Sequence, residues 1–191
     1  MKIVFLSALF ATVLLSSCSS DDDTGTTLEL PEEVITNVNV TLTSADGTEV
    51  ELLYADSDGF GLGEAGEATA ATLEANTVYT GSFEILNELA DEVEEMNVTA
   101  EIDELADEHQ FFFEPLGGLD IADFAYNDMD GNGYPVGLDF TITTGAASSG
   151  ILTITLLHEP NKSAEGVSEN DTTNEDQGES DFFIDFPITV N

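Results

Sequence analysis

Apolar side chains recur at every second position in most of the chain beyond residue 36. The clearest example is the C-terminal segment, whose alternating apolar residues are Phe182, Ile184, Phe186, Ile188 and Val190. A β-strand repeats every two residues, so one face of such a segment can be buried while the other faces water. The alternation therefore predicts strands, and Pro187, which has no backbone N–H, predicts an edge position for the last of them.

The same pattern, interrupted by turn signals, predicts a mainly β fold of about nine short strands. Asp46-Gly47 is a strong hairpin signal between two alternating runs. The predicted strands cover residues 38–42, 50–54, 79–85, 110–114, 119–126, 138–144, 151–158 and 182–190, with a weaker run that ends at residue 73. Short strands at this spacing predict an antiparallel β-sandwich, with a closed antiparallel β-barrel as the alternative.

Two segments depart from the alternation. In the first, residues 88–109, one stripe has helical spacing and Thr99 is a candidate N-cap, which predicts one short helix. The residues on that stripe are Ile102, Leu105, Ala106 and His109. The second segment, residues 159–180, is polar and acidic with few bulky apolar residues, so we expect a mobile loop there.

The charge of the chain excludes whole classes of partner. There are 40 Asp and Glu residues against 2 Lys and Arg, which gives a net charge of -38. Beyond Lys2, the single Lys or Arg is Lys162. Nucleic acid is excluded as a partner, because phosphate binding needs clustered basic side chains. Direct adhesion to anionic lipid is excluded for the same reason.

The N-terminus has the pattern of an export signal. Residues 1–17 contain Lys2 and then an apolar run that is too short to span a bilayer. Leu15-Ser16-Ser17-Cys18 resembles the lipobox of bacterial lipoproteins, which implies that the Cys18 thiol carries lipid and that the signal peptide is removed. The alternative is a secreted protein with a lone cysteine. Cys18 is the only cysteine, so an internal disulfide is impossible.

Three aspartates follow the predicted lipidation site at positions 21–23. This run resembles the surface-export signal of Bacteroidota-type lipoproteins, which implies an outer-membrane lipoprotein at the cell surface. The alternatives are a plain solvated linker and a periplasm-facing domain. The expected organisation is a signal peptide at 1–17, a lipidated acidic linker at 18–31 and a single β-domain at 32–191.

Residues 128–139 are the strongest candidate for a binding site in the sequence. The oxygen-bearing residues have the spacing of a calcium loop, with a glycine at the sharp turn, position 133. The candidate ligands are Asp128, Asp130, Asn132, the Tyr134 carbonyl and Asp139. Pro135 and the absence of flanking helices make an EF-hand the wrong description, so we expect a calcium loop between two strands. The alternative is an ordinary turn rich in Gly, Asn and Asp.

A second, weaker calcium loop is predicted after residue 55. Asp56, Asp58 and Glu67 hold positions 1, 3 and 12, but Phe60 replaces the oxygen ligand at position 5. The glycines at 61, 63 and 66 spell the dinucleotide-binding pattern. We reject that interpretation, because acidic residues crowd the loop and no basic residue offsets them.

The two histidines, His109 and His158, could hold zinc together with a carboxylate, although their separation in the sequence forms no local ligand motif. Packing or capping roles are the alternative. The sequence has no GxSxG elbow and no P-loop, and lipidation would consume the only thiol. We therefore expect that the protein is not an enzyme.

Four short segments resemble small acidic Bacteroidota-type outer-membrane and surface lipoproteins of unestablished function. They are residues 32–36 (EEVIT), 108–112 (EHQFF), 143–150 (TTGAASSG) and 158–162 (HEPNK). Some of these proteins carry the label "type 1 periplasmic binding fold", but this chain has neither the length nor the helices for two α/β lobes. The expectation is a lipid-anchored β-domain that binds calcium, an extracellular macromolecule or a small ligand. A ligand-carrying β-barrel is the alternative.

Overall fold

A computed structural model describes residues 34–61, 63, 65–171 and 178–191. The predicted signal peptide, Cys18 and the acidic linker at 18–31 lie outside the described residues. In the part of the chain that is described, no helix has the length and apolar character that crossing a membrane requires.

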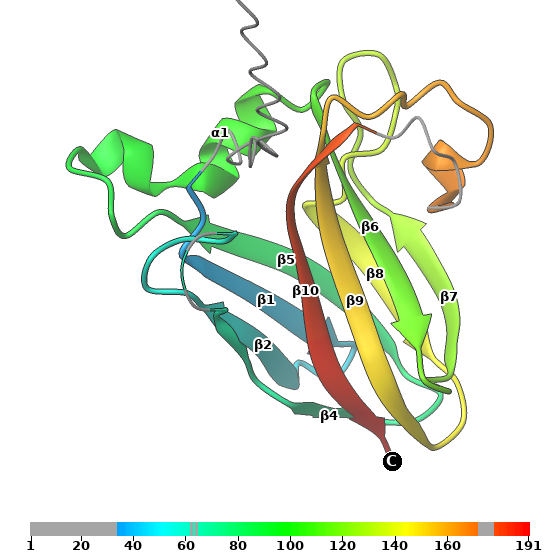
Figure 1. Ribbon diagram of the computed structural model, residues 1–191. Helices are drawn as coiled ribbons and strands as arrows, with labels where there is room; N and C mark the ends of the chain where they lie inside the picture. Colours follow the sequence, from blue (N-terminus) through cyan, green and yellow to red (C-terminus); the bar gives the residue numbers. More distant parts are fainter. Residues whose placement is uncertain (1–33, 62, 64, 172–177) are drawn as a thin grey trace, which may run out of the picture.

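Ten strands form two sheets within the described residues, which confirms the predicted mainly β sandwich (Figure 1). The six-stranded sheet has the order β3-β2-β1-β5-β8-β7, and the four-stranded sheet has the order β4-β10-β9-β6. The strands are β1 Asn37–Ser44, β2 Glu49–Ala55, β3 Glu67–Ala68, β4 Ala71–Leu73, β5 Val78–Leu86, β6 His109–Leu116, β7 Ile121–Tyr126, β8 Asp139–Thr144, β9 Ser148–His158 and β10 Glu179–Val190. All the pairings are antiparallel except that of β10 with β4.

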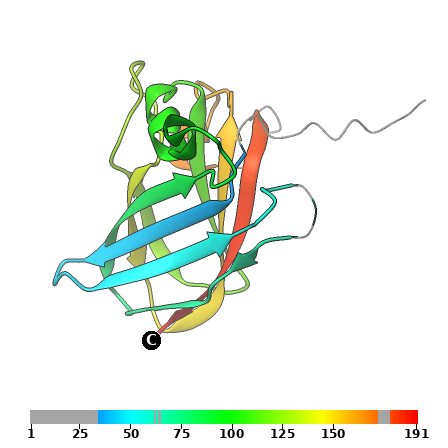
Figure 2. The ribbon, with the colours of Figure 1, turned by 90° about the vertical axis from the view of Figure 1, so that its left-hand side faces the viewer.

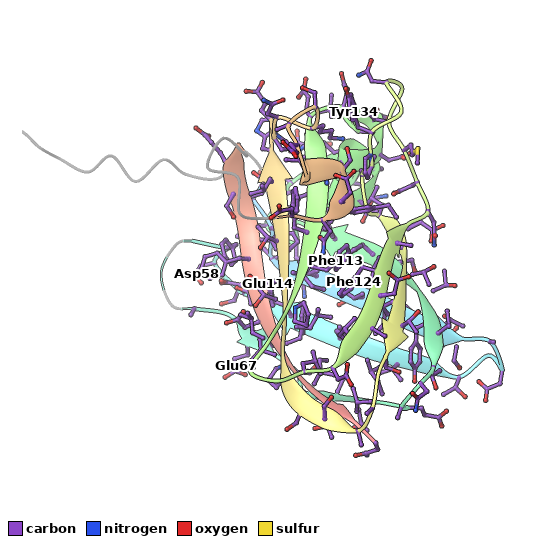
Figure 3. The ribbon with its side chains drawn as sticks, turned by 90° about the vertical axis from the view of Figure 1, so that its right-hand side faces the viewer. Asp58, Glu67, Phe113, Glu114, Phe124 and Tyr134 are labelled. Atoms are coloured by element: carbon purple, nitrogen blue, oxygen red, sulfur yellow. The ribbon has the colours of Figure 1, made fainter. Side chains whose placement is uncertain are left out.

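The six-stranded sheet curls around the core as a half-barrel, and the four-stranded sheet covers its open side (Figure 2). The alternating residues of β1, β5 and β10 point inward and are almost fully buried. Aromatic rings fill the space between the sheets. Phe83 of β5 stacks on Phe111 of β6 with ring centroids 4.3 Å apart, and Phe113 stacks on Phe124 of β7 at 5.3 Å (Figure 3).

Gly81 is needed for this aromatic packing. It lies opposite Phe140 in the pairing of β5 with β8. A Cβ atom at position 81 would stand 2.2 Å from the Phe140 ring, which is itself buried. The missing side chain therefore leaves the space that the Phe140 ring occupies, and this explains a glycine inside a strand.

The predicted helix is present but shorter than expected. α1 spans Val98–Glu104, preceded by the 3-10 turn η1 at Val93–Met96. Its N-cap is Asn97, whose side chain accepts from the Ala100 N–H, so Thr99 as N-cap was wrong. The Thr99 hydroxyl instead forms hydrogen bonds with the backbone of Ile85 in β5: it accepts from the Ile85 N–H and donates to the Ile85 carbonyl. His109 was also misplaced, since it begins β6 rather than continuing the helix.

Much of the predicted acidic loop packs against the outer face of β6. Residues 159–171 are described, and they include the 3-10 turn η2 at Val167–Glu169. Val167 is fully buried against Phe112 and Leu157, on the side of the four-stranded sheet that faces away from the main core. This second small cluster explains why five consecutive residues of β6, 109–113, are buried.

Candidate functional site

The 128–139 loop lies at one end of the molecule, away from the 56–67 loop, as the positions of Tyr134, Asp58 and Glu67 in Figure 3 show. The Asp128 carboxylate accepts two backbone hydrogen bonds, from Gly137 N–H at 2.7 Å and from Asp139 N–H at 3.0 Å. The Asp139 carboxylate turns toward the Asn127 side chain, at 3.1 Å. These contacts join the two arms of the loop through the Asp128 side chain.

Asp130 closes the tip of the same loop. Its Oδ1 accepts from the backbone N–H groups of Asn132, at 2.8 Å, and Tyr134, at 2.9 Å. The Tyr134 carbonyl accepts from the Asp130 N–H at 2.8 Å. Burial acts to raise the pKa of Asp130, but the two backbone donors and the neighbouring Lys162 outweigh it, so this pKa lies below its usual value.

The ammonium group of Lys162 holds the other Asp130 oxygen. Lys162 is 5% exposed, and its Nζ lies 3.1 Å from Asp130 Oδ2. It also donates to the Ala106 carbonyl at 2.6 Å and to the Pro135 carbonyl at 3.0 Å. All three ammonium protons therefore have acceptors. One buried cation thus joins the residues that follow α1, the 128–139 loop and the segment that follows β9.

The predicted calcium ligands are close in the chain, and the carboxylate oxygens of Asp128 and Asp130 and the Tyr134 carbonyl already have partners within the protein. No group of three or more His, Cys, Asp or Glu side chains with an arrangement suited to a metal ion occurs among the described residues. Calcium requires six to eight oxygen ligands. An ion at Asp128 and Asp130 would need backbone donors to move, and it would meet the positive charge of Lys162. Calcium binding here stays a prediction.

We expect millimolar calcium to raise the melting temperature above that in sodium chloride of matched ionic strength, if the loop binds calcium. An ion that binds only the folded state adds about 1.4 kcal/mol at ten times its Kd. Asp130→Ala would remove a predicted ligand and also the Lys162 partner, so the test variant is Asp139→Asn, which removes a predicted ligand charge from an exposed side chain hydrogen-bonded to Asn127. Asp139→Asn should reduce the excess stabilisation by calcium. Identical melting curves in the two salts would make the loop an ordinary turn.

The weaker loop has a different arrangement. Asp56 is 4% exposed; its Oδ2 accepts from the Tyr54 hydroxyl at 3.1 Å and its Oδ1 accepts from the Asp58 N–H at 3.3 Å. Glu67 lies in β3 and pairs in register with Ala55. Burial, with Asp56 beside it, raises the pKa of Tyr54 to about 12. The phenol is therefore neutral and can donate to Asp56 at neutral pH.

A pocket of about 550 Å³ opens beside this loop, where the edge of β10 meets the end of β2. In Figure 2 the end of β2 and the chain that follows it lie next to β10. We call it the seam pocket, and its main lining residues are Tyr54, Asp56, Phe60, Phe183, Asp185 and Pro187. Within the described ranges, β4 pairs with β10 only at residues 188–190, so the earlier part of this β10 edge has no strand hydrogen-bonded to it.

In the seam pocket, the ring of Phe60 is tilted against two other aromatic rings, those of Tyr54 and Phe183. The centroid of Phe60 lies 6.2 Å from that of Tyr54 with 55° between the ring planes, and 5.6 Å from that of Phe183 with 79° between them. Phe183 is 59% exposed. Tilted rings at these distances form a corner with aromatic faces on more than one side. The pocket therefore combines an apolar wall with two carboxylates, Asp56 and Asp185.

The two histidines, far apart in sequence, are neighbours in the structure. His109 and His158 are paired across β6 and β9, and their rings stack with centroids 5.0 Å apart. His109 Nε2 lies 3.9 Å from Asp181 Oδ2, and His158 Nε2 lies 3.6 Å from Glu108 Oε2. A packing role at the end of a strand fits this arrangement. Zinc binding by this pair stays a hypothesis.

Sequence reasoning missed the aromatic part of the seam pocket and the role of Lys162. The sequence offered one signal for Lys162, which is the single Lys or Arg beyond Lys2 against 40 acidic residues, but its burial and its acceptors appear only in the structure. No comparable signal marked Phe60 and Phe183, since each belongs to an ordinary apolar run or loop until β10 is placed beside β2.

Comparisons with known proteins provide no relatives for this chain. No family model matches it, no curated protein is significantly similar in sequence, and no solved structure is significantly similar in fold.

Proposed function

We propose that this protein is a lipid-anchored domain of the bacterial cell surface that binds a ligand and carries out no catalysis. The observation that carries the binding part is the seam pocket, whose apolar wall opens to solvent beside an unpaired strand edge. Its volume, about 550 Å³, lies within the range of ~300–1,000 Å³ that is typical of small-molecule sites. A macromolecular partner remains the alternative ligand.

The packing of the sandwich interior favours the seam pocket over the core as the ligand site. In a ligand-carrying barrel the ligand would lie between the strands. Here Phe83, Phe111, Phe113 and Phe140 occupy that space, with neighbouring ring centroids 4.3 to 6.3 Å apart. The alternative of a ligand inside a barrel is therefore the less favoured proposal.

The anchoring part rests on the sequence around Cys18. More than one acyl chain would give stable membrane attachment, because each buried methylene contributes about 0.8 kcal/mol. The charge of -38 also means that the domain itself is repelled by anionic lipid, so attachment depends on the acyl chains.

We expect Cys18→Ala to move the protein from the membrane fraction to the soluble fraction or to stall it as an unprocessed precursor. Cell fractionation followed by mass measurement distinguishes these two forms from the lipidated protein. Ser20→Ala, two residues further on, is the matched control and should stay in the membrane fraction. Protease added to intact cells should digest the wild-type domain if it faces outward. A Cys18→Ala protein that is still processed and anchored would contradict the lipoprotein proposal.

A further inference from the structure

The Asp56 carboxylate has no counter-charge within the described protein. It is 4% exposed, and its contacts are a phenol hydroxyl and a backbone N–H. Among the described residues it forms no ion pair, and Lys162 is bound elsewhere, to Asp130. A buried charge is normally paired, because its removal from water is costly. A ligand that brings a positive charge to Asp56 would supply the missing partner.

The surroundings of Asp56 indicate which kind of cation fits. A metal ion needs a shell of hard oxygen atoms, whereas the seam pocket presents Tyr54, Phe60, Phe183 and Pro187 around its two carboxylates. Aromatic faces attract organic cations through the ring quadrupole, and this attraction is strongest where water is excluded. The combination of tilted rings with a buried carboxylate is complementary to an alkylammonium group, which has an apolar surface and a full positive charge.

We propose that the seam pocket binds a small organic cation of the alkylammonium class. This inference rests on the binding function proposed above and narrows it to one chemical class of ligand. Asp56 supplies the buried negative charge, Asp185 adds a second carboxylate from β10, and the three rings enclose the alkyl groups. The net charge of -38 raises the local concentration of cations near the surface and so favours their encounter with the pocket.

Calorimetric titration of the full-length lipoprotein with choline chloride tests the proposal. The protein is held in phosphatidylglycerol nanodiscs, which contain no choline headgroups, at constant ionic strength. The comparison ligand is the neutral carbon analogue of choline, in which a tert-butyl group replaces the trimethylammonium group. We expect choline to bind and the neutral analogue to bind at least about tenfold more weakly, since it lacks the charge that Asp56 and the rings attract.

Two variants locate the site. Phe183→Leu keeps an apolar side chain at an exposed position but removes the ring, and it should weaken choline binding roughly threefold to tenfold. Asp56→Asn keeps the shape and removes the charge, and it should weaken binding about tenfold. The matched control is Asp123→Asn, an equal change of charge on the exposed surface of β7 at the other edge of the six-stranded sheet, which should leave binding unchanged.

Three results would overturn the proposal. Equal binding of the neutral analogue would make the pocket an apolar site, and the binding function would stand with an uncharged ligand. Binding of choline that survives both Phe183→Leu and Asp56→Asn would place it elsewhere on the surface. Failure of choline to bind at all would exclude this ligand class, whereas the lipid anchor would still be judged by the fractionation of Cys18→Ala.

Discussion

Lys162→Met should lower the free energy of unfolding by about 3–5 kcal/mol, the cost of breaking a buried ion pair from one side. The Asp130 side chain is 1% exposed, so its charge would remain buried without the ammonium group. The carbonyls of Ala106 and Pro135 would also lose their donor. Methionine fills a similar volume, so the loss would report the charge and the hydrogen bonds. Chemical denaturation of wild type and variant measures the difference.

A double-mutant cycle provides the control for this result. Asp130→Asn alone also breaks the pair, whereas the double variant leaves no buried charge. We therefore expect the double variant to lose clearly less stability than the sum of the two single variants. A loss below about 1 kcal/mol for Lys162→Met, the range of exposed pairs, would show that the ammonium group is not held as described.

Because folding lowers the pKa of Asp130, its contribution to stability should depend on pH. A carboxyl group whose pKa is lowered on folding contributes stability above its unfolded pKa, and this contribution is lost as the pH falls through the folded value. The stability that Asp130 provides should therefore be present at neutral pH and lost as the pH falls below the ordinary aspartate pKa of 3.8. In the Asp130→Asn variant this part of the acid dependence should be absent.

Asn170→Ala should produce the second large effect, a loss of about 2–4 kcal/mol of stability, from three side-chain hydrogen bonds, one of them from the Tyr126 hydroxyl, and an unfavourable backbone conformation. The Asn170 amide accepts from Phe113 N–H at 2.8 Å and donates to the Phe113 carbonyl at 2.7 Å. It thus pairs with the outer edge of β6 as a neighbouring strand would. Its φ of 64° lies in the left-handed region, which asparagine tolerates better than alanine.

Thermal unfolding of Asn170→Ala beside two controls separates these causes. Asn170→Gly removes the side-chain amide, but glycine adopts the left-handed backbone conformation readily. Its loss of stability should therefore be smaller than that of Asn170→Ala by the cost of placing alanine in that conformation. Asn39→Ala removes a half-buried side chain on the sheet surface that hydrogen-bonds Glu84, and should change the stability by less than about 0.5 kcal/mol. If the Asn170→Ala protein were as stable as wild type, the hydrogen bonds from Asn170 to the edge of β6 would make no contribution to stability.

The strands could be predicted because each of them buries one face, so the period-two pattern is present in the sequence. β1 follows it along its whole length, and β10 follows it from Phe182 onward. The extent of the helix was wrong because the helical stripe continued by chance into β6, where His109 is buried by its pairing with β9 instead. Periodicity along the chain cannot distinguish a residue that is buried on a helix from one that is buried in a strand by pairing with a distant strand.

The packed part of the acidic segment and the seam pocket could not be predicted, since both depend on contacts between distant residues. Val167 is one apolar residue in a polar segment, and only the shape of β6 and β9 makes a place for it. The calcium pattern at 128–139 identified a loop closed by carboxylates, but spacing alone did not indicate that Lys162, 32 residues further from Asp130, would supply a positive charge. A spacing motif contains only residues that are close in the sequence, so it cannot include a distant residue such as Lys162.

Hydrogen–deuterium exchange of the full-length lipoprotein in phosphatidylglycerol nanodiscs, with and without choline chloride, tests the central claim most directly. A ligand in the seam pocket should slow amide exchange at both of its walls, in peptides that cover residues 54–61 and 179–187. Peptides from the 128–139 loop should exchange at the same rate in both conditions. Unchanged exchange at the two seam segments, or slowing confined to residues 128–139, would contradict the account of this domain as one that binds its ligand between β2 and β10.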